Sequence, residues 1–286
     1  MHFPPRPASS PHGSFAYATL NDCADDEKGP MPDCRRTWLR QLSAASLAEA
    51  PHLLLCPHAG AGAASQRALG EACASWSTPW SIQYPGRQDR AGEAPASNIR
   101  DIAETTAAEM AKEAVSDTRP VDVFGHSMGA LVAFEVTRSL EQLGVPVRSL
   151  TISAAVPAHT VAGQPDHPKT DEGIVDRIVG LAGTDDAILA DPELVALAVE
   201  ALRADYTMID SYSCPDTAQV SCPITVFGGD ADPVAPLATL WGWGTHTSSS
   251  CTVLAFRGGH FYLSTRLAEV AKQIEDIHKT TETELT

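Results

Sequence analysis

The segment Gly125-His126-Ser127-Met128-Gly129 constrains the fold of this chain more than any other stretch. A β-branched, apolar run at 121–124 enters it, and residues 130–136 leave it with the apolar spacing of a helix. A nucleophile elbow has this order, namely a strand, a strained turn with serine at its tip, and a helix. Both glycines are needed because a Cβ at either position would collide with the adjoining strand or helix. We therefore predict an elbow with Ser127 as the nucleophile, rather than a chance match in a loop.

Length and charge narrow the possible functions. The chain has 286 residues, which suits one large α/β domain or two small ones. A formal net charge of −16 argues against nucleic acid or an anionic membrane as a partner. No apolar run has membrane-spanning length, and because the first residues lack a basic-then-apolar pattern, we expect no signal peptide. Seven scattered cysteines without a Cys-x-x-Cys pair predict reduced thiols in a cytoplasmic protein and no metal site.

The order of expected elements predicts an α/β fold. Residues 1–35 are rich in proline and lack periodicity, so we predict a disordered leader there and a folded domain over 36–286. Strands that alternate with helices imply a mostly parallel sheet with helices on both faces. The strands are expected at 52–56, 80–84, 121–124, 147–153, 223–227 and 251–256, and the outer helices at 99–114 and 262–278.

The segment at about 157–218 interrupts this alternation and is predicted to be a helical lid insertion. It carries helix-like stretches at 171–181 and 192–212 but no strand pattern. Its apolar and aromatic side chains could line an acyl pocket or could be the lid's own packing face. They are Ile188, Leu189, Leu194, Leu197, Tyr206, Met208, Ile209 and Tyr212.

A serine nucleophile needs a histidine base and a carboxylate that orients this base. In an α/β-hydrolase these partners follow the serine on later strand ends, the acid before the histidine. His260 follows the strand at 251–256 through a flexible Arg-Gly-Gly approach, so we predict that it is the base rather than a surface histidine. Asp230 and Asp232 both follow the strand at 223–227. We favour Asp232 as the acid and expect Asp230 to form a turn with its own backbone.

Two backbone amides are expected to bind the oxyanion of the reaction. One belongs to Met128, directly after the nucleophile. The other should come from the small-residue loop after the strand at 52–56, where Ala59 is the best candidate. The pair Gly60-x-Gly62 in this loop is not a dinucleotide fingerprint, because it lacks the third glycine and the acidic residue after the next strand.

Five motifs in chain order resemble those of the stand-alone type II thioesterases that accompany non-ribosomal peptide and polyketide synthases. They are Pro57-His58-Ala59-Gly60, Tyr84-Pro85-Gly86-Arg87 with Arg90, the elbow, Gly229-Asp230-Ala231-Asp232, and Gly258-Gly259-His260-Phe261-Tyr262-Leu263. The resemblance implies an α/β-hydrolase fold, the triad Ser127, Asp232 and His260, and oxyanion amides at Ala59 and Met128. It also implies hydrolysis of acyl thioesters on the phosphopantetheine arm of carrier proteins, with no cofactor of the enzyme's own. Cys56 and Ala61 depart from the family pattern without touching the triad.

Two other functions stay open at this point. A general carboxylesterase or lipase of the same fold would share the triad, and a catalytically silent scaffold would not use it. Because carrier proteins are usually acidic, long-range charge should oppose rather than assist docking of a carrier to this acidic chain. Arg177 and Arg203 on the lid are candidate docking residues, although ordinary exposed helix charges are the more common explanation. We expect a monomer.

Overall fold

A buried strand and a buried helix flank Ser127 in the computed structural model, which describes residues 38–43, 49–117, 119–181 and 190–285. Strand β4 (Val121–His126) is buried along its whole length, and helix α3 (Met128–Gln142) begins directly after the serine. Along β4, Val123 packs into one hydrophobic cluster and Phe124 into another, because successive side chains point to opposite faces of a sheet. The elbow therefore lies at the centre of the fold.

The sheet has seven strands in the order β1-β3-β2-β4-β5-β6-β7. All neighbouring pairs are parallel except β1 with β3. The mostly parallel sheet predicted from the sequence is thus confirmed, whereas the short edge strand β1 was not predicted. Besides β4, the strands are β1 (Leu39–Gln41), β2 (His52–Cys56), β3 (Thr78–Ile82), β5 (Val147–Ser153), β6 (Ile224–Gly229) and β7 (Cys251–Phe256).

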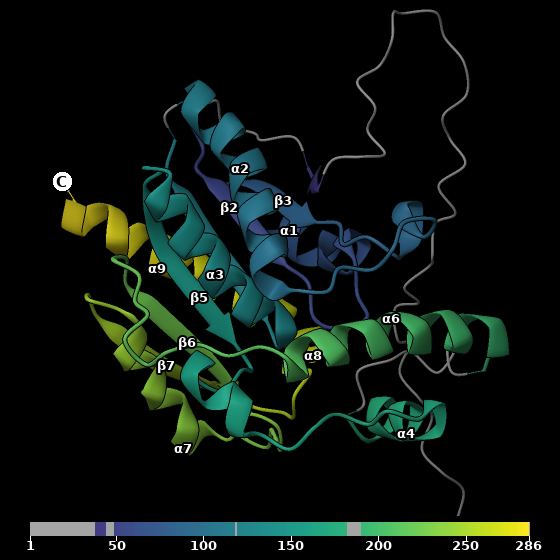
Figure 1. Ribbon diagram of the computed structural model, residues 1–286. Coiled ribbons are helices and arrows are strands. Elements are labelled where there is room, and N and C mark those ends of the chain that lie inside the picture. The colour runs from purple at the N-terminus through teal and green to yellow at the C-terminus, as the bar shows by residue number, and fades with distance from the viewer. Residues whose placement is uncertain (1–37, 44–48, 118, 182–189, 286) are drawn as a thin grey trace, which may run out of the picture. The chain divides into compact units, whose positions relative to one another are not determined.

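Helices cover both faces of the sheet. On one face, α2 (Ile99–Asp117) and α3 pack side by side over Leu54 and Cys56 of β2 (Figure 1). On the other face, α1 (Arg67–Cys73) and α9 (Leu267–Leu285) pack over Leu53 and Leu55. Successive side chains of β2 point to opposite faces of the sheet, so they enter two separate hydrophobic clusters. A strand that is buried on both faces needs apolar side chains on both.

The described part of the predicted lid is helical. It contains η3 (Ala158–Gly163), α4 (Asp171–Leu181) and α6 (Pro192–Asp210), and α4 and α6 pack against each other at one end of the sheet (Figure 1). The start of α6 is fixed by Asp191, whose side chain accepts hydrogen bonds from two backbone amides of the first turn. Ile188 and Leu189 lie outside the described residues, as does the predicted leader at 1–35.

The C-terminal helix differs from its prediction. The expected single helix at 262–278 is two helices, α8 (Tyr262–Thr265) and α9, which are separated at Arg266. His278 is buried, and its Nδ1 lies 3.1 Å from the Asp122 carboxylate. The remaining short elements are η1 (Ala63–Gln66), η2 (Gln88–Arg90), α7 (Leu237–Leu240) and η4 (Trp241–His246). Over the described ranges, none of the helices combines the length and apolarity required to span a bilayer.

Candidate active site

Ser127 occupies a strained backbone conformation at the tip of the elbow. Its φ of 56° and ψ of −122° are unusual for a residue with a side chain. A Cβ on Gly125 would lie 2.0 Å from the carbonyl oxygen of Gly129, and one on Gly129 would lie 2.1 Å from that of Cys56. The two glycines therefore let the helix and the neighbouring strand approach closely enough to hold the serine in this conformation.

Ser127, His260 and Asp232 form a continuous hydrogen-bonded chain. The Nε2 of His260 lies 2.9 Å from Ser127 Oγ, and its Nδ1 lies 2.9 Å from Asp232 Oδ2. An ionised carboxylate can only accept, so it fixes the proton on Nδ1 and leaves Nε2 free to accept the serine proton. Burial by itself raises the pKa of Asp232, but hydrogen bonds from His260 and from backbone amides outweigh this effect and lower the pKa. Asp232 is thus held as a carboxylate at neutral pH.

Asp230, the competing carboxylate, bonds elsewhere. Its Oδ1 accepts a hydrogen bond of 2.9 Å from the amide of Gly258, so it does not form the local turn expected from the sequence. The amide of Ala231 donates in turn to the carbonyl of Gly258. These bonds join the loop that follows β6 to the loop that carries His260. Asp230 therefore holds together the two loops that place Asp232 beside His260.

A buried polar network lies behind the His260 ring. The ring centroid of His126 is 5.4 Å from that of His260, and His126 Nδ1 lies 2.8 Å from Ser153 Oγ. Ser153 Oγ is also 2.6 Å from the hydroxyl of Tyr262. Burial holds the pKa of His126 well below its usual value, so this ring stays neutral. Because His126 is neutral, it does not repel the positive charge that His260 gains when it acts as a base.

The loop that carries Ala59 is fixed by a buried ion pair. Asp205 of α6 accepts hydrogen bonds of 2.6 Å from both terminal nitrogens of Arg87 and one of 2.7 Å from the amide of Gly60. Gly60 has a φ of +78°, and a Cβ there would lie 2.8 Å from Leu202 of α6. This glycine therefore permits both the turn and the close contact with the helix. Ala59 itself lines the same cavity as Ser127.

His58, next to Ala59, also lines this cavity. Its Nδ1 donates to the carbonyl of Ala59 at 2.9 Å, and its ring packs edge-on against Phe261. Loss of water around the ring lowers the pKa of His58 to about 4. His58 is thus a neutral wall of the cavity at physiological pH.

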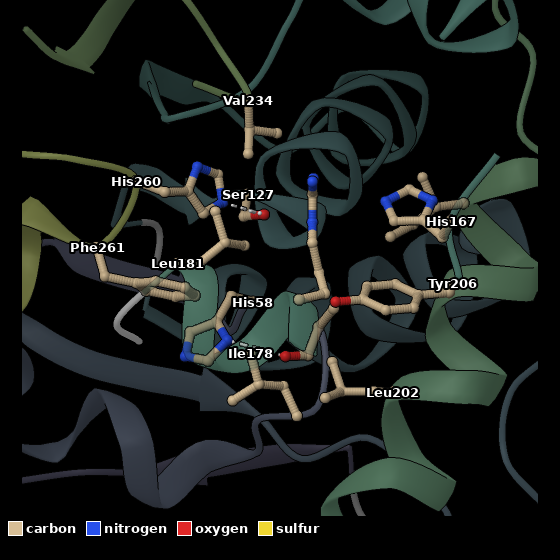
Figure 2. Close-up of a pocket in the computed structure, with 13 residues that line it drawn as sticks. His58, Ser127, His167, Ile178, Leu181, Leu202, Tyr206, Val234, His260 and Phe261 are labelled. Atoms are coloured by element: carbon tan, nitrogen blue, oxygen red, sulfur yellow. Dashed lines mark hydrogen bonds between the residues drawn. The ribbon is translucent and has the colours of Figure 1, made fainter. Parts of the chain in front are cut away.

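The cavity next to Ser127 has a volume of about 80 Å³. Figure 2 shows Ser127 and His260 on one side of it, and Leu202 and Tyr206 of α6 on another. Most of the lining is apolar, which suits an acyl chain. The apolar lining residues are Ala59, Ile178, Leu181, Leu202, Ile209, Val234 and Phe261.

Comparison with known proteins identifies the family. A model of the thioesterase domain matches residues 51–278. The chain belongs to the thioesterase family. It is 35% identical over 242 residues to a probable cadicidin biosynthesis thioesterase of Streptomyces griseus, covering 85% of this chain and 66% of that protein. It is 36% identical over 263 residues to the phenyloxazoline synthase MbtB of Mycobacterium tuberculosis, covering 91% of this chain but only 18% of the synthase. The chain therefore spans less than two thirds of the length of each of these curated relatives.

A solved structure confirms the fold. The type II thioesterase BorB from the borrelidin biosynthetic cluster matches with a TM-score of 0.71 and 33% identity, covering 84% of this chain and 97% of BorB. The α/β-hydrolase fold predicted from the sequence and the resemblance to type II thioesterases are thus both confirmed. The comparisons do not assign roles to individual residues, so the roles of Ser127, Asp232 and His260, and of the amides of Ala59 and Met128, stay predictions.

Only some of the apolar residues expected to line an acyl pocket do line the cavity. Tyr206 and Ile209 do line the cavity. Leu194 and Leu197 are 40% and 61% exposed, and Met208 and Tyr212 are buried in the core, so these four are not lining residues. Leu202 also lines the cavity but was not predicted to do so. Helical spacing indicates it, since 202, 206 and 209 lie on one face of a helix.

The two candidate docking arginines also differ from each other. Arg203 is partly exposed, with 42% of its side chain accessible, and it pairs with Asp171, as expected for an ordinary helix charge. Arg177 instead lines the cavity that contains Ser127. Nothing in the sequence distinguished them, because both lie on helices of the predicted lid.

Proposed function

We propose that this protein is a serine thioesterase that hydrolyses acyl groups from the phosphopantetheine arm of carrier proteins. The observation that carries the proposal is the hydrogen-bonded chain from Ser127 through His260 to Asp232, with 2.9 Å at each step, in a member of the thioesterase family. The family match and the likeness to BorB favour a thioester over a simple oxygen ester as substrate. Removal of stalled or aberrant acyl groups from a synthase is the biological role that this activity would serve.

The proposed reaction has two steps. Ser127 Oγ attacks the thioester carbonyl while its proton passes to His260 Nε2. The carbon–sulfur bond then breaks as His260 gives this proton to the departing sulfur, which leaves an acyl-enzyme, a free thiol and a neutral His260. In the second step, His260 takes a proton from water as the water oxygen attacks the acyl-enzyme. His260 then gives this proton to Ser127 Oγ as the ester bond breaks, which releases the carboxylic acid and restores Ser127. A thiol leaves readily because its pKa is about 8.5, so protonation of the leaving group is a minor requirement.

Catalysis of thioester cleavage therefore depends mainly on stabilisation of the oxyanion in the transition state. We assign it to the backbone amides of Ala59 and Met128. The position of Met128 directly after the nucleophile and the place of Ala59 in the cavity wall support this assignment. Loss of one such donor typically costs about 3 kcal/mol of transition-state stabilisation. The reaction as written requires no metal or cofactor of the enzyme's own, since the substrate carries the phosphopantetheine.

We further propose that the protein acts in the cytoplasm as a monomer on an acidic carrier. The net charge of −16 supports docking through short-range apolar contacts rather than through long-range attraction. Carrier affinity that stays nearly constant as salt is added would agree with this. A steep loss of affinity with salt would contradict it.

A general carboxylesterase is the main alternative, and substrate preference separates the two. Initial rates should be compared for an acyl group on a carrier protein and for the same acyl group on an oxygen ester. A thioesterase should have the higher kcat/KM on the carrier, whereas equal turnover of both would favour the esterase. A fluorophosphonate probe that labels the wild type but not Ser127→Ala would exclude a silent scaffold. Absence of labelling in the wild type would favour the scaffold.

A further inference from the structure

One positively charged side chain lies in the otherwise mostly apolar acyl cavity. Arg177, in the middle of α4, lines the cavity together with Ser127 and His260. Neighbouring wall positions are occupied by Ile178 and Leu181 of the same helix. An acyl chain attached to Ser127 would therefore extend into a space that contains a guanidinium group.

Among the described residues, Arg177 has no carboxylate partner, unlike several other arginines. Arg87 pairs with Asp205, Arg138 with Glu135 and Arg203 with Asp171. Across the described ranges, no carboxylate pairs with Arg177, and its buried Nε has no hydrogen-bond partner. A guanidinium that is partly removed from water, with no paired carboxylate among the described residues, favours a ligand that supplies negative charge.

A second polar group faces the same space. Figure 2 shows the hydroxyl of Tyr206 directed toward the middle of the cavity. Burial raises the pKa of Tyr206, which keeps the hydroxyl protonated, and the nearby charge of Arg177 opposes that rise. A protonated phenol can donate to an anion beside the guanidinium.

We propose that Arg177 is a specificity-determining residue that binds a carboxylate on a short acyl chain, with Tyr206 as a second donor. The inference rests on the proposed thioesterase function and names the acyl class that the site prefers. A guanidinium is the group that best matches the two oxygens of a carboxylate. A cavity of about 80 Å³ has room for only a few atoms beyond the thioester carbonyl, which limits the acyl chain to a short one.

The test compares acyl groups of equal shape and different charge. Malonyl and isovaleryl thioesters of N-acetylcysteamine differ by a carboxylate in place of an isopropyl group, as do succinyl and 4-methylpentanoyl thioesters. Because a bond to a charged group is lost, Arg177→Met should lower the malonyl-to-isovaleryl ratio of kcat/KM about tenfold or more. Thermal unfolding of Arg177→Met, compared with that of the wild type, shows that the variant is folded, and its kcat/KM on the isovaleryl thioester is the internal reference for the ratio. Arg177→Lys should restore part of the ratio.

Arg203→Met is the matched control, because it removes a lid arginine that does not line the cavity. Its ratio should equal that of the wild type. An unchanged ratio in Arg177→Met, or an equal fall in Arg203→Met, would overturn the inference while leaving the thioesterase function intact. Failure of the wild type to hydrolyse any of the thioesters, including acyl carriers, would overturn the function and the inference together.

The phosphate of the carrier's arm is the other anion that Arg177 could bind. The N-acetylcysteamine thioesters lack this phosphate, whereas coenzyme A thioesters of the same acyl groups contain it. If Arg177→Met weakens turnover of both coenzyme A thioesters equally and leaves both N-acetylcysteamine thioesters unchanged, the ligand is the phosphate. That result would contradict the assignment to the acyl carboxylate.

Discussion

Asp205 and Arg87 form a bidentate ion pair that connects the helical insertion to the loops around the nucleophile. Both hydrogen bonds are 2.6 Å long, and the two side chains are only 2% and 7% exposed. The same carboxylate accepts the amide of Gly60, next to Ala59. The buried carboxylate of Asp205 therefore joins α6 to the loop that contains Ala59.

Asp205→Asn tests this anchor. The substitution leaves Arg87 buried without a counter-charge, so the free energy of unfolding should fall by about 3–5 kcal/mol. Denaturant unfolding measures the change. The exposed pair Arg266–Glu269 provides the control, and Glu269→Gln should cost less than about 1 kcal/mol. Equal losses in the two variants would contradict the proposed importance of the buried pair.

The closeness of the elbow to β2 gives a second prediction. A Cβ at Gly129 would meet two carbonyl oxygens at the end of β2, at 2.1 and 2.5 Å. Backbone cannot yield as a side chain can, so Gly129→Ala should destabilise the protein by about 3 kcal/mol or more. Gly92→Ala is the control, since nothing lies within 4 Å of the added Cβ. Thermal unfolding of both variants should show a large shift for the first and almost none for the second.

The two aspartates after β6 can be distinguished by kinetics. Asp232→Asn should lower kcat by roughly 10⁴-fold, because an amide stabilises the wrong tautomer of His260. Asp230→Asn keeps an oxygen that can accept the Gly258 amide, so it should retain most of the activity. Steady-state rates on one thioester measure both. A larger loss in Asp230→Asn would reverse our choice of the acid.

Much of the fold and of the candidate site could be predicted from local sequence. The two glycines of the elbow are required by close backbone contacts, so they can be recognised in the sequence. His260 and Asp232 follow apolar strands, and the carboxyl ends of parallel strands meet at one edge of the sheet. The Arg87–Asp205 pair could not be predicted, because its partners are 118 positions apart and no local periodicity connects them. Strand β1 has only three residues, too few to show alternation. The cavity position of Arg177 depends on how α4 packs, which its own sequence does not specify.

His126 should make stability depend on pH. Its pKa in the folded protein is well below the value of 6.5 expected for the unfolded chain. Between these two values only the unfolded state binds the proton, so stability is full above about pH 6.5 and falls as the pH decreases below it. His126→Asn removes this titration and should reduce the loss of unfolding free energy between pH 8 and pH 5. Denaturant unfolding at several pH values measures the loss. A pH dependence equal to that of the wild type would contradict this role.

The most direct test of the central claim is intact-mass analysis of an acyl-loaded carrier protein incubated with the enzyme. Wild-type enzyme should remove the acyl mass and leave the free phosphopantetheine arm, whereas Ser127→Ala should leave the acyl mass in place. Removal of the acyl group by both proteins would show that Ser127 is not the nucleophile. Retention of the acyl group with the wild type, while a simple oxygen ester is cleaved, would contradict a thioesterase that acts on carriers.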